Sequence, residues 1–450
     1  MKPDRVKYAA VTAVVVAALA ATTVVVHHQS QSAVLTGYWW VGVAVIALCL
    51  ISFIKGRSFT HLPVAQGAVV AIIPSFEEET AKLHRTVWSL LRQTHPIDEI
   101  HVIDDGSTKH PVEPFDHPRV FWHRQENTGK RGAQVTVLRK LREQGKDFRF
   151  ILTIDSDGEP FPDALEQQLR AMSNPKIQAT TGMIYIRNFE ESWVSRAADI
   201  DIGASCVMMR SSRSMLGALE TTSGALALYR SEILYDHLEE YAVECGTGDD
   251  RWLALRALLR GEVVAVNEAG VITDMPTTLK KTYRQRLRWA RSWWWMLPFV
   301  MTRLSLKQLI SPTFGLLQLV ITPLMVIWTL VMTALTLGGR YENPGAAFMY
   351  LVAYGIVRYG QSALYLIHRP DITTKQRLWS WLVGTPAATF MNIVLLTPTR
   401  YWALTKLNDN SWQSRGLTQA VRLRKGKHRR VRGSHARKNR ASEDLMTLSA

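Results

Sequence analysis

Long apolar runs near both ends of the chain constrain its fold more than any other feature. Residues 8–26 and 38–54 precede a charged middle region, and residues 314–337, 346–367 and 379–396 follow it. A run of about 20 apolar residues is long enough to cross the hydrocarbon core of a bilayer as a helix. The sequence therefore predicts an integral membrane protein with a soluble middle.

The basic residues around the first two runs indicate their orientation. Three Lys or Arg precede the first run and two follow the second, whereas the loop 27–37 has none. By the positive-inside rule, the N-terminus and the middle region lie on the cytoplasmic side of the cell (inner) membrane. A cleaved signal peptide is the alternative, but the first run exceeds a usual h-region and a second run follows at once.

The last apolar segment, residues 379–396, is interrupted by Gly384, Thr385 and Pro386. Five full crossings from a cytoplasmic N-terminus would place the basic C-terminal tail outside the cell, against the positive-inside rule. We therefore expect this segment to be a re-entrant or broken hairpin, because proline interrupts a helix.

The net charge of +16 is concentrated in the tail. Residues 415–440 contain eleven Lys and Arg and no acid, which leaves +5 for the rest of the chain. We expect the tail to be disordered and to lie on anionic lipid headgroups, with nucleic acid as the weaker alternative. The three cysteines are far apart and have no metal-ligand spacing, so neither a disulfide framework nor a zinc site is indicated.

The middle region alternates short apolar strands with amphipathic helices, a pattern typical of a mostly parallel α/β sheet. Three of the strands end in acidic sequences, PSFEEE, DDGS and DSDG. Ligands of such sheets bind beyond the carboxyl ends of the strands, so we expect the three acidic ends to converge. Asp155 and Asp157 project the same way from an extended chain and suit Mg²⁺ or Mn²⁺ bridging a diphosphate. An Asp-rich turn is the alternative.

Six motifs occur in a familiar order: IIPSFEEE, VIDDGS, NTGKRGAQ, TIDSDG, GTGDDRWL and QRLRW. In this order the chain resembles processive family 2 glycosyltransferases, the group of hyaluronan, chitin, chitooligosaccharide and cellulose synthases. The resemblance implies a GT-A domain inserted between transmembrane helices, which binds UDP-sugars beside a channel for the growing polysaccharide. The expected regions are a transmembrane hairpin (1–58), the GT-A domain (59–275), interfacial helices (276–312), a channel region (313–400), a Trp-containing loop (401–417) and the basic tail (418–450).

The resemblance implies a donor-nucleotide site and a metal ligand, Asp157. The nucleotide-binding residues that it implies are Ser75, Glu78, Asp104, Asp105, Lys130, Arg131 and Asp155. A carboxylate in VIDDGS can accept the N3–H of uracil, and an ordinary turn is the alternative. A cation at the start of a helix can contact phosphate, and a solvated helix face is the alternative. Glu77 stands where the family usually has Asn, which puts a nucleotide contact at this position in doubt.

For catalysis, the resemblance implies that Asp250 is the general base, which deprotonates the acceptor hydroxyl in a single inverting displacement. Asp249 would then be a capping residue; the alternative is that both acids cap the helix. The stretch TTSGALALYR, residues 221–230, resembles the strand that lines the acceptor sugar.

Acceptor and diphosphate contacts are implied for Gln285, Arg288 and Trp289 of the QxxRW pattern. Tryptophan suits stacking on a sugar and arginine suits a diphosphate, while an interfacial helix anchored at headgroups is the alternative. Trp412 and Arg415 occupy a loop that closes over the donor in the family.

The GDDR form favours a hyaluronan synthase-like enzyme using UDP-GlcNAc and UDP-GlcA, although Trp252 departs from the usual His. A chitin-type N-acetylglucosaminyltransferase and a non-processive transferase to a lipid phosphate are the enzymatic alternatives. A receptor with a degenerate transferase domain is the nonenzymatic one, and the intact acidic motifs argue against it.

Overall fold

The computed structural model describes residues 57–246, 248–339 and 345–407, together with a few isolated positions before residue 57. These residues form an eight-stranded sheet with flanking helices, followed by a wholly helical part. The strands are β1 Val69–Ser75, β2 Glu99–Asp104, β3 Val120–Arg124, β4 Phe150–Thr153, β5 Glu159–Pro160, β6 Ile177–Ile186, β7 Ala227–Arg230 and β8 Glu262–Thr273.

The helices of the sheet part follow the strands in the alternating pattern that the sequence predicts. They are α3 Thr80–Leu91, α4 Lys130–Glu143, α5 Ala164–Met172, α6 Trp193–Ala204, the π-helix η1 Ser205–Arg210, α7 Ser211–Met215, α8 Ser231–Tyr235, α9 Leu238–Glu244 and α10 Asp249–Arg260. The helical part contains α11 Leu279–Arg303, α12 Leu306–Leu337, α13 Gly345–His368, α14 Thr374–Trp379, η2 Ser380–Gly384, α15 Thr385–Met391, η3 Asn392–Leu396, α16 Thr397–Trp402 and η4 Ala403–Lys406.

The sheet has the strand order β3-β2-β1-β4-β7-β6-β8-β5. β1 is parallel to β2 and β4, β2 to β3, and β6 to β8, whereas β7 is antiparallel to both of its neighbours and β5 to β8. The predicted mostly parallel sheet is confirmed. Because β2, β1 and β4 are adjacent, the acidic sequences that follow them emerge at one edge, as the sequence predicts.

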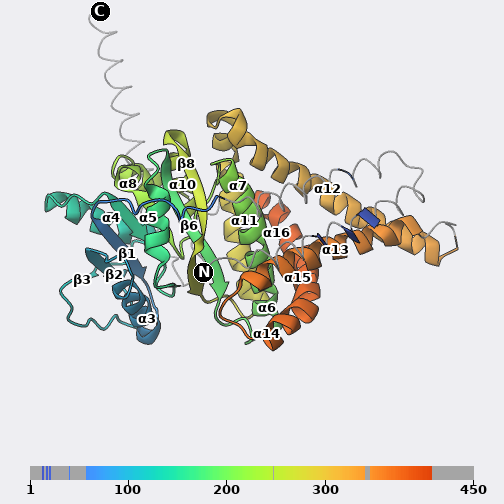
Figure 1. Ribbon diagram of the computed structural model, residues 1–450, viewed down its shortest axis with the longest axis horizontal. Helices are drawn as coiled ribbons and strands as arrows, with labels where there is room; N and C mark the ends of the chain where they lie inside the picture. The colour runs from blue at the N-terminus through green and yellow to red at the C-terminus, as the bar shows by residue number, and fades with distance from the viewer. Residues whose placement is uncertain are drawn as a thin grey trace, which may run out of the picture.

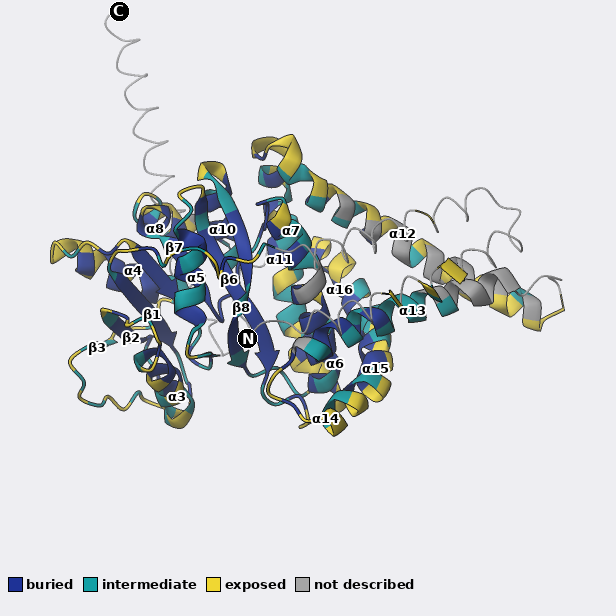
Figure 2. Ribbon diagram, in the orientation of Figure 1, coloured by how far each residue is buried: buried dark blue, intermediate teal, exposed yellow. Residues whose placement is uncertain are grey.

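Alternate residues of β1 enter two hydrophobic cores, one on each face of the sheet. Val69, Ala71 and Ile73 pack in the core that includes α3, and Val70 and Ile72 pack in the core that includes α4 and α10. Successive side chains of a strand point to opposite faces, so helices on both sides bury the whole strand. Figure 2 shows the sheet as the most deeply buried layer.

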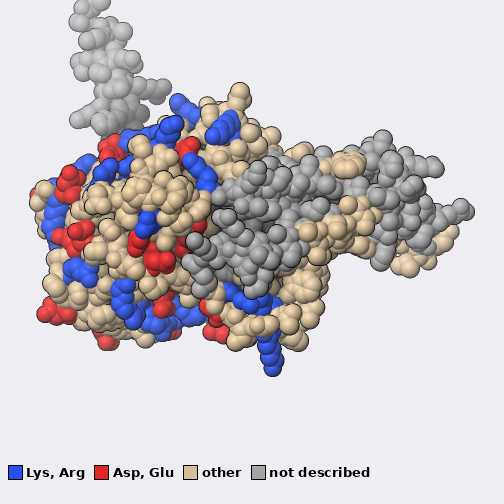
Figure 3. All heavy atoms as spheres, in the orientation of Figure 1, with Lys and Arg blue, Asp and Glu red and all other residues tan. Residues whose placement is uncertain are grey.

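The helical part lies beside the sheet part, with α11 and α14–α16 next to the sheet and α6, and with α12 and α13 extending as an arm (Figure 1). On the face drawn in Figure 3, acidic and basic side chains are scattered over the sheet part, whereas the described surface of the far end of the arm shows neither. The expected boundary at residues 312 and 313 falls inside α12, which is one helix of 32 residues.

The expected hairpin in residues 379–396 is wrong. The chain from Thr374 to Lys406 is one helical stretch of 33 residues. Pro386 and Pro398 each lie in the first turn of an α-helical segment that follows a π-helical one, η2 and η3 respectively. Proline is tolerated in a first turn, and the two π-helical segments accommodate the interruptions without a reversal of the chain.

Within the described residues, this stretch is the one helix long and apolar enough to cross a membrane. α12 and α13 coincide with the two other apolar segments expected after the middle region, and both are helical. The runs expected before residue 57 and the basic tail lie outside the described residues, so a multi-span arrangement stays a prediction.

A buried ion pair joins the end of α13 to α6. The Arg369 guanidinium lies 2.5 Å from Asp199 Oδ2, and Tyr365 donates a hydrogen bond of 2.7 Å to Asp199 Oδ1. Gly203 makes room for this contact, because a Cβ there would lie 2.2 to 2.4 Å from the Tyr365 ring. The arm is therefore anchored directly to the sheet part.

Candidate active site

The first part of the site lies where β1 and β2 end. Ser75 is paired in register with Asp104, and the Asp105 N–H donates to the Ser75 carbonyl at 2.8 Å. Asp104 accepts a hydrogen bond from Ser107 N at 2.9 Å and lies 3.2 Å from Arg124. Ser75 Oγ is buried and makes no hydrogen bond in the described residues, so it retains polar capacity for a ligand, whereas Asp104 Oδ2 is ion-paired with Arg124.

Asp105 connects this edge to the start of α4. Its carboxylate accepts hydrogen bonds from Gln125 Nε2 at 2.7 Å, Thr128 N at 2.9 Å and Gly129 N at 2.7 Å. Burial raises the pKa of Asp105, and these hydrogen bonds oppose the rise. Asp105 therefore holds the NTGKRG loop, whereas the two oxygens of Asp104 are held by Ser107 and Arg124.

Lys130, the first residue of α4, joins two acidic motifs. Its Nζ lies 2.7 Å from Asp155 Oδ1 and 3.1 Å from Asp249 Oδ2, with only 13% of the side chain exposed. Burial lowers the pKa of a lysine, but the charges of Asp155 and Asp249 outweigh it and raise the pKa of Lys130 well above its usual value. The DSDG and GDDR sequences thus meet in the fold, while a phosphate contact by Lys130 stays a prediction.

Gly224 explains how these groups approach so closely. A Cβ at this position would lie 2.7 Å from Lys130 Nζ and 2.8 Å from Asp155 Oδ2. Gly224 belongs to the TTSGALALYR stretch and precedes β7, which pairs with β4. Only a residue without a side chain fits here unless the ion pair shifts.

Asp249 and Asp250 open α10 with opposite electrostatic properties. Burial opposes ionisation of Asp249, but Lys130 and Arg288 outweigh it and hold its pKa below the usual value. Burial, followed by the charge of Asp249, raises the pKa of Asp250 to about 7. The backbone of Asp250 is fixed by Thr222, whose hydroxyl donates to the Asp250 carbonyl at 3.0 Å.

The expectation that Asp249 caps the helix is wrong. The N-cap is Gly248, no side chain accepts a hydrogen bond there, and the Asp249 carboxylate is engaged with Lys130. The general-base role expected of Asp250 agrees with its pKa, because a base is most effective when its pKa lies near the working pH.

Asp157 lies among other acids at the end of β4. Burial, followed by the charges of Asp155, Glu78 and Asp274, raises the pKa of Asp157 to about 7. Thr273 donates a hydrogen bond of 3.2 Å to Asp157 Oδ2. The Ser156 hydroxyl donates to Glu78 at 2.9 Å, so Glu78 is tied to the DSDG turn.

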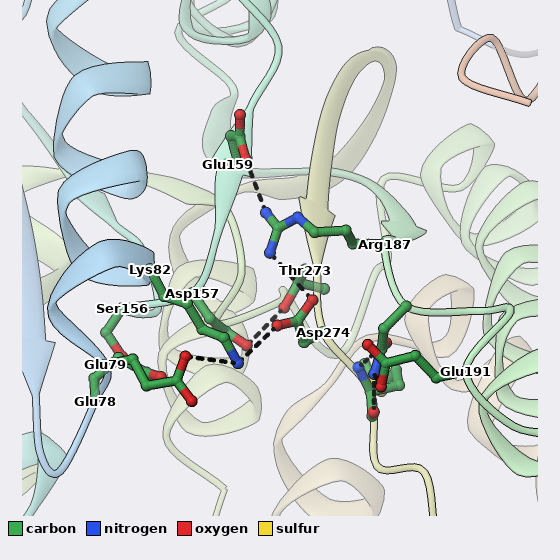
Figure 4. A network of polar contacts seen from close by, with 12 residues as sticks. Glu78, Glu79, Lys82, Ser156, Asp157, Glu159, Arg187, Glu191, Thr273 and Asp274 are labelled. Atoms are coloured by element: carbon green, nitrogen blue, oxygen red, sulfur yellow. Dashed lines mark hydrogen bonds and ion pairs between the residues drawn. The ribbon is translucent and has the colours of Figure 1, made fainter.

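Two cations surround this acidic group, as Figure 4 shows. Lys82 on α3 lies 3.2 Å from Asp274 Oδ2. Arg187, at the end of β6, contacts Asp274 Oδ1 at 3.1 Å and Glu159 at 2.9 Å. This network joins α3, β5, β6 and the segment that leads into α11. Sequence reasoning missed Lys82, Arg187 and Asp274, which belong to none of the six motifs.

The acidic group fits a divalent cation only in part. Among the described residues, no three His, Cys, Asp or Glu side chains are arranged as a complete metal site. Asp155 and Asp157 would supply two oxygen ligands, and a diphosphate and water would supply the others, as is usual for Mg²⁺. The raised pKa of Asp157 marks a position where like charges crowd and where a cation would be stabilised.

Helix α11 brings the QxxRW residues next to these motifs. Gly248 packs on it so closely that a Cβ would lie 2.3 Å from Ser292 Cβ. Trp289 is 37% exposed, and the guanidinium of Arg286, which sequence reasoning missed, lies 4.5 Å from its ring centroid. Gln285 Nε2 contacts the Met275 sulfur at 3.7 Å, and its Oε1 is buried without a hydrogen bond in the described residues.

Of the remaining predicted residues, one follows Lys130 on α4 and two lie outside the described residues. Arg131 lies beside the buried Cys245; burial raises the pKa of that thiol, and the charge and hydrogen bond of Arg131 oppose the rise. Trp412 and Arg415 lie outside the described residues.

Comparison with known proteins agrees with this arrangement. Residues 70–238 match the family described as Glycosyl transferase family 2. A hyaluronan synthase of Streptococcus pyogenes serotype M1 is 27% identical over 409 residues, which are 83% of this chain and 91% of that protein. An N-acetylglucosaminyltransferase of Rhizobium meliloti (strain 1021) is 28% identical over 395 residues, 82% of this chain and 86% of that protein.

Among solved structures, a mannosyltransferase from Pyrobaculum calidifontis in complex with GDP-Man and Mn²⁺ aligns with 87% of this chain and 99% of that chain, at 14% identity and a TM-score of 0.43. The family match, together with the mostly parallel sheet, identifies a fold of the GT-A type.

Proposed function

This chain is a family 2 glycosyltransferase, and from that premise we propose that it polymerises and translocates a polysaccharide from UDP-sugars, as a processive inverting enzyme of the hyaluronan synthase kind. The observation that carries the proposal is the ion pairing of Lys130 with Asp155 and Asp249. These contacts bring Asp155, proposed for the donor diphosphate, close to Asp249, the neighbour of the proposed base Asp250. The 27% identity with a hyaluronan synthase along most of both chains supports this product class.

In the proposed reaction, Asp250 accepts the proton of the acceptor hydroxyl. The hydroxyl oxygen forms a bond to C1 of the donor sugar while the bond from C1 to the diphosphate oxygen breaks, so the configuration at C1 inverts and UDP leaves. A pKa of about 7 suits Asp250 for this step, because the carboxylate is ionised near neutral pH and still binds a proton. The positive charges of Lys130 and Arg288 hold the pKa of Asp249 below its usual value, so this carboxylate stays ionised beside Asp250.

The donor diphosphate would be held near Asp155 and Asp157. A bound Mg²⁺ or Mn²⁺ supplies neutralisation of the charge that develops on the leaving group. Ser75, Glu78, Asp104 and Asp105 would form or support the nucleoside pocket. Lys130, Arg131 and Arg288 provide nearby positive charge, and Gln285 and Trp289 are proposed to contact the sugar chain.

The topology we propose places the active site and the tail in the cytoplasm without a hairpin in residues 379–396. The helical stretch 374–406 lies against α6 and α11: Asn392 donates to Asp201 of α6 at 3.2 Å, Trp294 of α11 donates to the Arg400 carbonyl at 2.7 Å, and Gly384 packs on Ile200 of α6. Although this stretch is the one described helix long and apolar enough to cross a membrane, its polar contacts lead us to propose that it lies along the membrane surface and that the apolar segments in α12 and α13 cross. With the two N-terminal runs this gives an even number of crossings.

A single cysteine placed in the tail of an otherwise Cys-free variant tests this topology. It should react with an impermeant maleimide in inverted vesicles and not in intact cells, and labelling of intact cells would contradict it. Trp412 and Arg415 would then reach the donor from the cytoplasm, so Trp412→Ala should reduce synthesis without changing membrane insertion.

Product analysis tests the function. Membranes containing the enzyme are given labelled UDP-sugars singly and in pairs, with membranes containing Asp250→Asn as the control. Polymer that requires both UDP-GlcNAc and UDP-GlcA and is digested by hyaluronidase supports the proposal. Polymer formed from UDP-GlcNAc alone and digested by chitinase supports the second candidate, which the 28% identity with an N-acetylglucosaminyltransferase favours. A short lipid-linked product would contradict processivity.

A further inference from the structure

Glu77 has a backbone conformation that its residue type disfavours. Its φ of 52° is the one positive φ of a non-glycine residue among the described residues. A non-glycine residue in this region is strained and persists where surrounding contacts hold it. Glu77 lies two residues after Ser75, at the edge where β1 ends.

The contacts that hold Glu77 are five hydrogen bonds from one loop. Its Oε1 accepts from Thr108 N at 2.9 Å, Thr108 Oγ1 at 3.0 Å and Lys109 N at 3.2 Å. Its Oε2 accepts from Lys109 N and from His110 N, each at 3.0 Å. The hydrogen bond from Thr108 N, with the others, outweighs desolvation and lowers the pKa of Glu77 to about 2.

The same loop is joined to Asp104. Glu77 N donates to Ser107 Oγ at 2.8 Å, and Ser107 N donates to Asp104 Oδ1 at 2.9 Å. Arg124 contacts both Ser107 and Asp104, with one nitrogen 2.8 Å from the Ser107 carbonyl and another 3.2 Å from Asp104 Oδ2. Glu77 thus acts on Asp104 through Ser107, and its carboxylate faces the loop.

We propose that Glu77 is a positioning residue for the nucleoside part of the donor: it fixes the 107–110 loop and thereby the orientation of Asp104. This inference rests on the proposed function, because it assumes that Asp104 faces a bound nucleoside diphosphate. An amide in place of the carboxylate would keep one acceptor oxygen and turn an NH₂ group toward backbone N–H donors. The loop would then lose the contacts made to Oε2, and Asp104 would lose its fixed orientation.

The test compares Glu77→Gln with Glu113→Gln in the full-length protein in detergent. Glu113 is exposed on the same loop region, so its substitution changes the charge equally. Calorimetric titration with UDP in the presence of Mn²⁺ should give a Kd raised about tenfold for Glu77→Gln and unchanged for Glu113→Gln. The donor KM should rise with Kd while kcat at saturating donor stays at the wild-type value, a division that general unfolding would not produce.

Two milder variants guard against misfolding. Glu77→Asp keeps the charge and should recover part of the affinity, and Ser107→Ala, which removes the link to Glu77 N, should raise Kd in the same direction. An unchanged Kd in Glu77→Gln and Ser107→Ala, or a fall in kcat with Kd unchanged, would overturn the inference. Absence of UDP binding by the wild-type protein would instead overturn the proposed function.

Discussion

Lys130 Nζ lies 3.1 Å from Asp249 Oδ2, so the first residue of α4 and the first residue of α10 meet as a buried ion pair. The same nitrogen contacts Asp155 at 2.7 Å. One cation therefore fixes the relative positions of the two acidic motifs on which the proposed reaction depends, and it keeps Asp249 ionised beside the proposed base.

Removing this cation should destabilise the protein. Lys130→Met removes the cation that both carboxylates contact, and breaking a buried pair in this way costs about 3–5 kcal/mol. Chemical denaturation of the purified chain measures the loss. The control is Arg139→Met on the same helix, whose pair with Glu239 is exposed and worth about 0.2–1 kcal/mol. Equal losses in the two variants would show that the Lys130 pairs do not stabilise the fold.

Gly224→Ala should disable the site while leaving the sheet folded. The new Cβ would meet Lys130 Nζ and Asp155 Oδ2 at 2.7 and 2.8 Å, so one of them must move. We expect transfer to fall at least about tenfold, because small displacements of positioned groups are costly. Gly355→Ala is the control, since no atom lies within 4 Å of a Cβ at that position. Wild-type transfer by Gly224→Ala would refute the close approach.

Metal-dependent donor binding should weaken in acid. The pKa of Asp157 is raised to about 7, so below that pH a cation must displace a proton before the carboxylate can bind it. Affinity for Mn²⁺ in the presence of UDP should fall by up to about tenfold per pH unit below 7 and level off above it. Asp157→Asn should abolish the metal dependence of UDP binding. A titration that is independent of pH would contradict the role of Asp157.

Transfer itself should require the ionised form of Asp250. With a pKa of about 7, this carboxylate is protonated in acid and cannot accept the acceptor proton. At saturating Mn²⁺ and donor, kcat should rise about tenfold per pH unit below 7 and reach a plateau above it. Because Mn²⁺ and donor are saturating, protonation of Asp157 does not contribute to this pH dependence of kcat. A kcat that is constant between about pH 5 and pH 9 would exclude Asp250 as the base.

The sequence predicts the acidic strand ends well because each motif is local: an apolar run followed by Asp and Gly is readable without the rest of the fold. β3, Val120–Arg124, was missed because its short run is mixed with polar residues. The pairing of Lys130 with Asp249 joins residues far apart in the chain and depends on the placement of α4 and α10 on the same face of the sheet. No local pattern encodes it.

The errors have physical causes of the same kind. Gly384 and Pro386 predicted a reversal, but π-helical segments accommodate the interruptions, and the continuous helix packs on α6. Asp249 has the residue type and position of a cap, yet a buried lysine offers it a stronger partner than backbone N–H groups. The hydrogen bonds of Glu77 to residues 108–110 appear only once the loop is placed.

The central claim, that Asp250 acts in the chemical step and not in donor binding, is tested most directly by one comparison. UDP is titrated with Mn²⁺ into the wild-type protein and Asp250→Asn, and transfer by both is measured under the same conditions. The account predicts a Kd for UDP within about twofold of wild type and a loss of transfer of about 100-fold or more. Loss of UDP binding by Asp250→Asn, or transfer near the wild-type rate, would contradict it.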